Sequence, residues 1–253
     1  MAGNALLIRK LRKSFGALRV IDDLSLAVEQ GERHAVIGPN GAGKTTLFNI
    51  VTGWLKPTSG DVWLNGHRMD HLSPQKAVRH GFSRSFQRNM LLEGVTVLEN
   101  LRLACQAFAG SRWQMLRPAV SYRAPIERAR EIAARLDLSD VLTVLVRELS
   151  YGKKRQLEVA LALCPSPKVL LLDEPAAGTS PDERKKLISL IRSLPPQLTL
   201  LLVEHDMDVV FELCTRITVL SYGQVLASGT VEEIRSNQSV RDAYLGKVKH
   251  AHA

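Results

Sequence analysis

The chain has 253 residues, of which 45% are hydrophobic, so it can form one large α/β domain with a sizeable core. Its 34 Lys and Arg against 25 Asp and Glu give a net charge of +9, which suits an anionic ligand or membrane surface. The basic residues are scattered, and no long basic arm or aromatic-interleaved patch is present, so nucleic acid is not an expected partner.

The cysteines and the hydropathy pattern exclude further classes. Cys105, Cys164 and Cys214 are far apart and form no C-x-x-C pair, which argues against a disulfide framework or a zinc site and favours a reducing cytoplasm. We expect no signal peptide, because the N-terminus leads directly into a strand-like run. No segment approaches about 18 uninterrupted apolar residues, so we do not expect the chain to span a membrane by itself.

Short β runs come first, at residues 6–8, 24–28 and 35–37. Between the first two, Phe15 precedes a glycine in a turn. Simple packing and stacking on a nucleotide base are about equally good interpretations of this aromatic residue.

The third run leads into the stretch 38–46, GPNGAGKTT, which matches G-x-x-x-x-G-K-[ST], the phosphate-binding loop. A strand before it and a helical pattern after it are the context that this motif requires. Glycines allow the backbone to turn tightly and approach a phosphate, and the N–H groups at a helix N-terminus attract an anion. Lys44 is expected to contact the β/γ-phosphates, and Thr45 to offer its hydroxyl to Mg²⁺.

The segment after the loop continues the alternation of turns, strands and helices. Residues 61–66 predict a strand that ends in a turn. Ser73 and Pro74 predict a short helix with Ser73 as N-cap. Residues 82–87 predict a strand that ends on Gln87, usually a surface position unless a nucleotide lies nearby.

From about residue 88 to 165 the apolar residues recur at helical spacing, and Pro118 and Pro125 are predicted to separate helices. We expect a helical subdomain at 88–165, inserted into a nucleotide-binding core formed by residues 1–87 and 166–253. Near its end, Ser150 precedes an apolar-periodic helix and suits an N-cap. With Gly152, the same helix N-terminus also has the geometry to bind a phosphate.

Two apolar runs return afterwards, each followed by a helical pattern, which predicts a parallel sheet covered on both faces. The first ends in Asp173 and Glu174, and the second is followed by His205. Catalytic groups in such sheets lie at the carboxyl ends of the strands. We expect Asp173 to hold Mg²⁺, Glu174 to act as general base towards a water, and His205 to contact the γ-phosphate.

In this order the motifs resemble those of the ATP-binding subunits of ABC transporters over nearly the whole chain. The corresponding segments are the Walker A loop (38–46), the Q-loop residue Gln87, the signature motif (149–153), the Walker B strand with Glu174, the D-loop (177–180) and the switch residue His205. Finer features resemble the branched-chain amino acid uptake subgroup. They are the stretches RSFQ (84–87), VTVLEN (95–100), LSYGK (149–153), VEHDM (203–207) and AYLG (243–246).

The resemblance implies a P-loop ABC ATPase fold, with a mostly parallel core sheet, an N-terminal antiparallel β subdomain and an inserted helical subdomain. It also implies that Phe15 stacks on adenine, that Lys44, Gln87 and His205 contact or sense the γ-phosphate, and that Glu174 polarises the attacking water. The implied metal ligands are Thr45, Gln87 and Asp173. The implied nucleotide-binding residues are Gly38, Asn40, Gly41, Ala42, Gly43, Lys44, Thr45 and Thr46 of one subunit, with Ser150 and Gly152 of a second.

The implied partners are a second copy or a paralogous ATPase, polytopic permease subunits docked on the helical insert near Gln87, and a solute-binding protein. The implied location is peripheral, on the cytoplasmic face of the bacterial inner membrane. The implied function is ATP hydrolysis that powers uptake of branched-chain amino acids, or of a related small organic solute such as an amide, urea or aromatic acid, through the permease subunits. The alternatives are an ATPase for lipopolysaccharide export and an ABC ATPase that acts on nucleic acid or ribosomes without transport. Two departures from the family pattern are Tyr151-Gly152-Lys153 in place of Gly-Gly-Gln, and Ser180 where the D-loop often has Asp.

Overall fold

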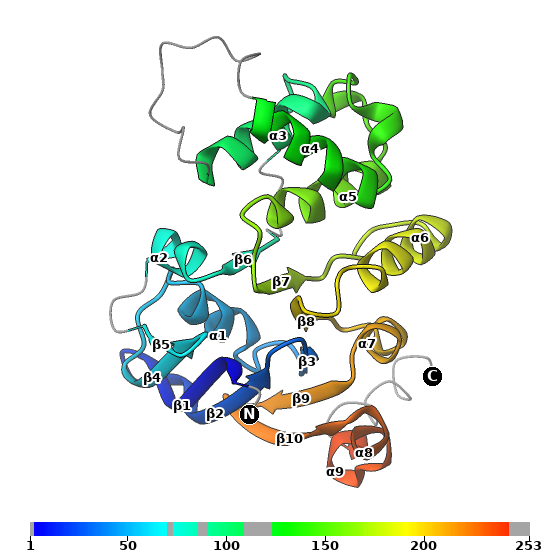
Figure 1. Ribbon diagram of the computed structural model, residues 1–253. Coiled ribbons are helices and arrows are strands. Elements are labelled where there is room, and N and C mark those ends of the chain that lie inside the picture. The colour runs from blue at the N-terminus through cyan, green and yellow to red at the C-terminus, as the bar shows by residue number, and fades with distance from the viewer. Residues whose placement is uncertain (1–2, 70–72, 86–90, 109–122, 243–253) are drawn as a thin grey trace.

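The computed structural model describes residues 3–69, 73–85, 91–108 and 123–242, and its strands form two sheets (Figure 1). The antiparallel sheet has the order β2-β1-β4-β5 and consists of β1 (Asn4–Phe15), β2 (Leu18–Glu29), β4 (Ser59–Leu64) and β5 (His67–Arg68). The second sheet has the order β10-β9-β3-β8-β7-β6. Its strands are β3 (Arg33–Ile37), β6 (Phe82–Arg84), β7 (Val169–Asp173), β8 (Thr199–Val203), β9 (Arg216–Ser221) and β10 (Gln224–Thr230).

The strands of the second sheet are parallel, except that β10 pairs antiparallel with β9. The predicted fold class, a mostly parallel core sheet with an N-terminal antiparallel sheet, is therefore confirmed. The helices are α1 (Lys44–Val51), α2 (Pro74–Arg79), α3 (Val97–Phe108), α4 (Arg123–Arg135), α5 (Tyr151–Leu163), α6 (Pro181–Arg192), α7 (Met207–Leu213), α8 (Val231–Ser236) and α9 (Gln238–Val240). In Figure 1, α3, α4 and α5 form one group at the end of the molecule away from β1 and β2.

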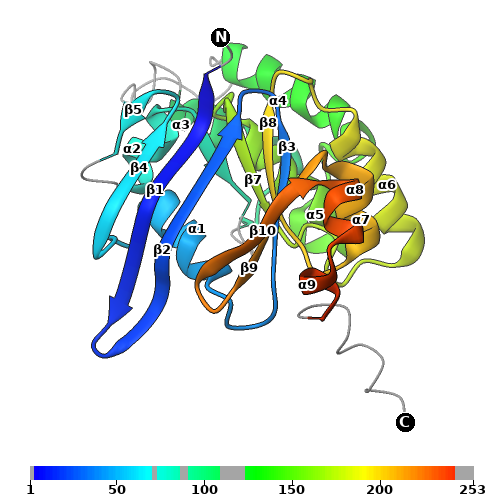
Figure 2. The same ribbon diagram turned by 90° about the horizontal axis from the view of Figure 1, so that it is seen from below.

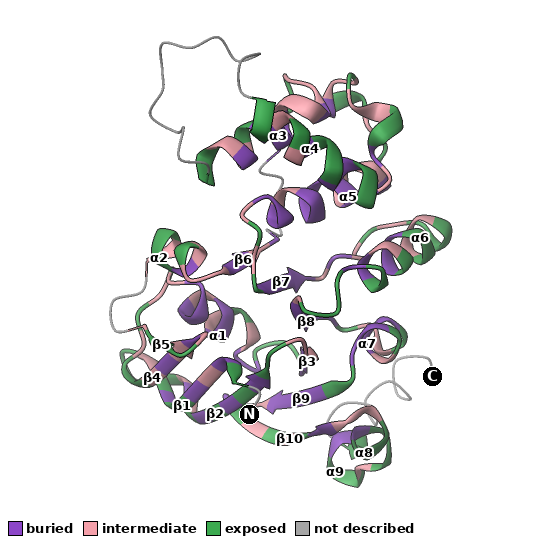
Figure 3. Ribbon diagram, viewed as in Figure 1, coloured by how far each residue is buried: buried purple, intermediate pink, exposed green. Residues whose placement is uncertain are grey.

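The parallel sheet separates two hydrophobic clusters because successive side chains of a strand point to opposite faces. Val169 and Leu171 of β7 pack with α1 and the antiparallel sheet. Leu170 and Leu172 pack with the helices α3 to α7 on the other face. Figure 3 shows these central strands buried and the outer faces of the helices exposed, and Figure 2 shows α1 beside β1 and β2. The continuous apolar runs of the sequence thus correspond to strands covered on both faces.

The first hairpin is longer than its apolar runs suggest. Residues 6–8 and 24–28 lie inside β1 and β2, which have 12 residues each. The register shifts at several points, and Lys10 (φ 47°) and Asp23 (φ 54°) have left-handed backbone conformations at these irregularities. These bulges break the two-residue alternation, and a short-window pattern therefore detects only part of each strand.

The helix ends agree with several predictions and correct one. Ser73 caps α2 by accepting a hydrogen bond from Lys76 N at 3.3 Å, with Pro74 at the first helical position, as predicted. The predicted break at Pro118 lies outside the described residues. Pro125 lies inside α4 rather than between helices, in the first turn, where proline removes no intrahelical hydrogen bond. The strand predicted at 82–87 ends at Arg84 among the described residues. Across the described ranges, no helix is both long and apolar enough to cross a membrane.

Candidate nucleotide-binding site

The predicted phosphate loop joins β3 to the N-terminus of α1. Gly43 precedes α1 with φ 100°, and no side chain caps the helix there. A Cβ on Gly38 would lie 2.4 Å from the carbonyl oxygen of Leu220 in β9, the strand beside β3. Only glycine therefore fits at this position. The first turn of α1 contains no acidic residue. This helix N-terminus therefore has the backbone N–H groups and the electrostatics that suit a phosphate.

Lys44 is half-buried and lies folded over the loop. Its Nζ donates hydrogen bonds to the carbonyl oxygens of Gly38 at 2.6 Å and Pro39 at 3.1 Å. Burial lowers the pKa of the Lys44 ammonium, and the charges of Glu174 and Asp173 oppose that shift. The ammonium is thus held near the turn that would surround a phosphate, with two carboxylates close enough to act on its charge.

Asp173 and Glu174 follow one another but have different surroundings. Asp173 ends β7 with its side chain only 5% exposed, whereas the Glu174 side chain is 35% exposed. Glu174 has a left-handed backbone (φ 47°) and donates its N–H to Val203 O at 2.9 Å. Burial raises the pKa of the Asp173 carboxyl, and the hydrogen bond and charge of Arg84 oppose it. One carboxylate is therefore fixed inside the sheet edge while the other faces outward, where a water can reach it.

His205 lies beyond the end of β8, and its side chain is 67% exposed. Its Nδ1 is 3.6 Å from Glu174 Oε1. The neighbouring Glu204 is buried and accepts hydrogen bonds from Ala176 N at 3.4 Å and His205 N at 3.2 Å. Burial raises the pKa of Glu204, and these backbone hydrogen bonds oppose the shift. Glu204 joins the loops after β7 and β8. Sequence reasoning gave it no role, although its place directly after a buried strand was a usable signal.

Arg84 is the second residue whose place the sequence did not predict. Its Nη2 donates to Asp173 Oδ2 at 2.6 Å, and its Nη1 donates to Asn49 Oδ1 of α1 at 2.9 Å. The parallel pairing of β6 with β7 brings these residues together. The structure therefore gathers Lys44, Asp173, Glu174 and His205 at the carboxyl edge of the sheet, with Arg84 bound to the most buried member.

The signature residues lie elsewhere. Ser150 caps α5 by accepting from Lys153 N at 3.3 Å, which confirms the predicted N-cap. Gly152 N donates to Glu183 Oε1 of α6 at 3.0 Å. In the described part of the chain, the hydrogen bonds of Ser150 and Gly152 lead to α5 and α6 and not to the phosphate loop. A single chain thus does not assemble the two groups of predicted nucleotide-binding residues.

Three further residues singled out from the sequence are Phe15, Gln87 and Ser180. Phe15 ends β1 and is 49% exposed, and Lys13 Nζ lies 4.8 Å from the centre of its ring. Its stacking on a base stays a prediction. Gln87 lies outside the described residues. Ser180, the D-loop departure, caps α6 in a reciprocal capping box with Glu183.

Among the described residues, no group of three or more His, Cys, Asp and Glu side chains could hold a metal ion by itself. Mg²⁺ usually keeps several waters and takes one or two protein oxygens together with substrate phosphates. The exposed Thr45 hydroxyl at the start of α1 and the Asp173 carboxylate are oxygen donors of this kind. The donor set therefore fits a nucleotide-bound Mg²⁺ rather than a permanently bound metal.

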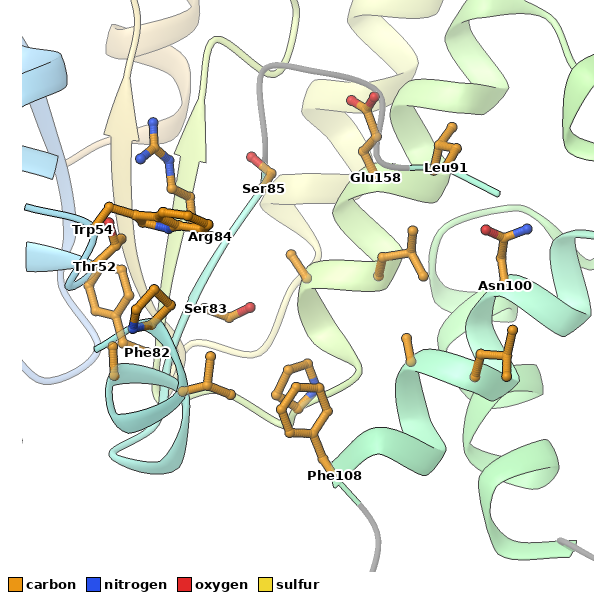
Figure 4. Close-up of a pocket in the computed structure, with 18 of the residues that line it drawn as sticks. Thr52, Trp54, Phe82, Ser83, Arg84, Ser85, Leu91, Asn100, Phe108 and Glu158 are labelled. Atoms are coloured by element: carbon orange, nitrogen blue, oxygen red, sulfur yellow. The ribbon is translucent and has the colours of Figure 1, made fainter. Parts of the chain in front are cut away.

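A mainly apolar groove of about 410 Å³ lies between α2 and β6 on one side and α3 and α5 on the other (Figure 4). Its lining includes Trp54, Phe82, Arg84, Leu92, Phe108 and Glu158. Two polar atoms of these residues, Arg84 Nε and Glu158 Oε1, are buried and have no hydrogen-bond partner among the described residues. The mainly apolar lining of the groove is suited to a mainly apolar segment.

A phosphate loop at the carboxyl edge of a mainly parallel sheet, facing a strand-terminal Asp-Glu pair, defines a P-loop ATPase. This chain belongs to the ABC transporter family, whose model, described as "ABC transporter", matches residues 21–177. A second model, "Branched-chain amino acid ATP-binding cassette transporter", matches residues 224–250. The chain is therefore an ABC ATPase.

Its relatives match nearly the full length of the chain. It is 39% identical to the high-affinity branched-chain amino acid transport ATP-binding protein LivG of Salmonella typhimurium, over 98% of this chain and 100% of LivG. It is 38% identical to the corresponding protein BraF of Pseudomonas aeruginosa, over 94% and 96% of the two chains. A crystal structure of a nucleotide-free ATP-binding cassette from an ABC transporter superposes with a TM-score of 0.83 at 29% identity, covering 96% of this chain and 99% of that one.

Proposed function

We propose that this chain is the ATP-hydrolysing subunit of an importer for branched-chain amino acids or a related small organic solute. The observation that carries the proposal is the end-to-end similarity to LivG, at 39% identity, together with the match of residues 224–250 to a branched-chain amino acid transporter model. The geometry at the sheet edge is compatible with it, since Lys44, Asp173, Glu174 and His205 lie close together there.

The phosphate-loop side binds the nucleotide. The backbone N–H groups from Gly38 to Thr46 surround the phosphates, and Lys44 exchanges its two carbonyl contacts for the β/γ-phosphates. Phe15 stacks on the adenine ring. Because burial disfavours the isolated Lys44 charge, a phosphate partner compensates for that cost by bringing an opposite charge to the ammonium.

The strand ends carry the chemistry. Thr45, Gln87 and Asp173 supply oxygen ligands to Mg²⁺, which when bound neutralises charge on the phosphates. Glu174 accepts a proton from the attacking water, a role suited to its partly exposed carboxylate. His205 and Gln87 contact the γ-phosphate, and the 3.6 Å separation between His205 Nδ1 and Glu174 Oε1 lets both act on the same region.

The second half of the site comes from another chain. Ser150 and Gly152 at the N-terminus of α5 contact the γ-phosphate held by a partner ATPase, which is either a second copy or a paralogue. ATP then stabilises the closed pair, and hydrolysis releases it. The groove of about 410 Å³ receives a segment of a polytopic permease, and a solute-binding protein delivers the solute to that permease. The ATPase is peripheral, on the cytoplasmic face of the bacterial inner membrane.

Co-purification tests this assignment. The Glu174→Gln variant, tagged and expressed in its source cell, is extracted from membranes in mild detergent with ATP, and its companions are identified by mass spectrometry. We expect two polytopic permeases, a second ATPase and, encoded with them, a solute-binding protein of the amino acid type. Lys44→Ala is the matched control, because loss of nucleotide should abolish ATP-dependent recovery of the second ATPase.

Other outcomes separate the alternatives. Recovery of a lipid-export permease supports lipopolysaccharide export. Recovery with ribosomes or nucleic acid, and without a permease, overturns the transport role and leaves the ATPase chemistry in place. Salt-sensitive binding of DNA or RNA would point to the same conclusion.

A further inference from the structure

Arg84 belongs both to the nucleotide-binding edge and to the groove. At the edge, its guanidinium holds Asp173 Oδ2 at 2.6 Å and Asn49 Oδ1 at 2.9 Å. It also lines the groove together with Trp54, which is 60% exposed. Figure 4 shows Arg84 and Trp54 at the same end of this pocket, across from Asn100.

The ion pair between Arg84 and Asp173 is buried, with the two side chains 9% and 5% exposed. Charges at such depth are held only where geometry and hydrogen bonds compensate for lost hydration. Arg84 Nε is buried and has no hydrogen-bond partner among the described residues. Within the described part of the chain, the guanidinium is held by its two bonds to Asn49 and Asp173, one from each terminal nitrogen of its planar fork.

The two bonds fix the carboxylate relative to the phosphate loop. Asn49 lies on α1, the helix that begins with Lys44 and Thr45, while Asp173 ends β7. A guanidinium that bridges them sets the distance and orientation between the two proposed metal donors, Thr45 and Asp173. A movement of Arg84 that breaks either bond would therefore move Asp173 relative to α1.

We infer that Arg84 is a positioning residue that couples the groove to the Asp173 carboxylate. A segment that enters the groove contacts the Arg84 and Trp54 side chains, and the shift of Arg84 changes how Asp173 presents its oxygen atoms for Mg²⁺·nucleotide. That the occupant is a permease segment rests on the function proposed above, but the coupling itself does not.

Coupling between two sites is reciprocal, so Mg²⁺·nucleotide must also change the groove. This makes the inference testable on the isolated chain. Trp54 is a reporter in the groove, and the chain has only three tryptophans. Replacing Trp63 and Trp113 with Phe gives a parent protein whose tryptophan emission comes from Trp54 alone.

The experiment titrates Mg²⁺ into this parent protein with a saturating non-hydrolysable ATP analogue, and follows Trp54 emission and nucleotide binding by calorimetry. In the parent we expect Mg²⁺ to change Trp54 emission. In Arg84→Met we expect the half-saturating Mg²⁺ concentration to rise about tenfold to a hundredfold, the usual effect of losing a residue that orients a metal ligand. The Trp54 response should be lost even at saturating Mg²⁺, while nucleotide binding in EDTA stays unchanged.

Glu158→Gln is the matched control. Glu158 is as buried as Arg84 and lines the same groove, but its ion pair is with Arg155, at 2.7 Å, and not with Asp173. It should therefore keep the parent's Mg²⁺ dependence. Equal Mg²⁺ shifts in both variants would mean that any buried charge in the groove has this effect, and would overturn the specific role of Arg84.

Three further results would overturn the inference. The first is an unchanged Mg²⁺ requirement in Arg84→Met, and the second is a lowered requirement, which would show that Arg84 competes with the metal. The third is a parent protein in which Mg²⁺ does not change the Trp54 emission. If Arg84→Met does not fold, Arg84→Lys decides, because an ammonium lacks the planar fork whose two terminal nitrogens hold Asn49 and Asp173 in fixed directions. Parent-like behaviour of that variant would reject the coupling. No permease is used, so this failure is distinct from a failure of the transport assignment.

Discussion

The two regions that we propose to contact the nucleotide phosphates are assembled to different degrees within one chain. At the carboxyl edge of the sheet, Lys44, Asp173, Glu174 and His205 lie together, joined by charge interactions and, through Arg84, by buried hydrogen bonds. At the N-terminus of α5, the hydrogen bonds of Ser150 and Gly152 among the described residues stay within α5 and α6, and the Gly152 N–H is bonded to the Glu183 carboxylate.

We infer from this difference that the region at the sheet edge can bind a ligand within one chain. At the N-terminus of α5, by contrast, the Gly152 N–H is already bonded to a carboxylate of its own chain. A carboxylate and a phosphate oxygen are both good acceptors for N–H groups at a helix N-terminus. We therefore expect some substitutions to act on the lone subunit and others to act only in an assembled pair of ATPase subunits.

The largest effect is expected from Glu174→Gln. Turnover should fall at least about 100-fold, as is typical when a general base is lost, while ATP binding persists. Single-turnover hydrolysis and equilibrium nucleotide binding measure the two quantities. Glu212→Gln, an exposed carboxylate paired with Arg192, is the control and should be neutral. Turnover near that of the unmodified protein would remove Glu174 from its proposed role.

Lys44→Ala should weaken ATP binding by the lone subunit by about tenfold to a hundredfold, the range for losing a hydrogen bond to a charged group. Calorimetry with a non-hydrolysable analogue measures it. Lys153→Ala is the control on the signature side, since Lys153 Nζ is bonded to Asp140 at 2.9 Å and not to the phosphate loop. Unchanged affinity in Lys44→Ala would count against the phosphate-loop assignment.

Gly152→Ala should separate the two regions. The new Cβ would lie 2.4 Å from Glu183 Oε1, so that carboxylate must move, and the methyl group would obstruct the helix N-terminus. We expect nucleotide affinity of the lone subunit to stay constant while steady-state turnover falls about tenfold, as for loss of one hydrogen bond to a charged group. Gly94→Ala, with open space around its Cβ, is the matched control. Reduced affinity in the lone subunit would show that α5 already contributes to the first region.

The smallest expected effect is on the pH dependence of folding stability, and it comes from Glu204. Burial raises the pKa of its carboxyl, so its favourable contribution to folding is present at low pH and is lost as pH rises through the folded-state pKa. Glu204→Gln removes this titration. Its stability relative to the unmodified protein should therefore increase with pH, by about 1.4 kcal/mol per unit of pKa shift. Urea unfolding of both proteins between mildly acidic and neutral pH measures the difference, and parallel curves would contradict the prediction.

The sequence predicted much of the fold because its signals are local. The apolar runs that became β7 and β8, the Ser73 and Ser150 caps and the glycine loop before α1 are each readable within a few residues. The extent of the first hairpin was missed, because bulges at Lys10 and Asp23 interrupt its alternation. Pro125 was misassigned, because a proline signals a helix break and a helix first turn equally well.

The chemical groups of this protein can be read from its sequence: a phosphate loop, an Asp-Glu pair and a histidine at strand ends, in an order that a family shares. These features follow from residue type and local spacing. Which of the groups meet depends instead on how the strands and helices pack against one another. The parallel pairing of β6 with β7 brings Arg84 onto Asp173, and the packing of α6 beside α5 places Glu183 on Gly152. Such contacts join residues 89 and 31 positions apart in the chain, and no local pattern specifies them.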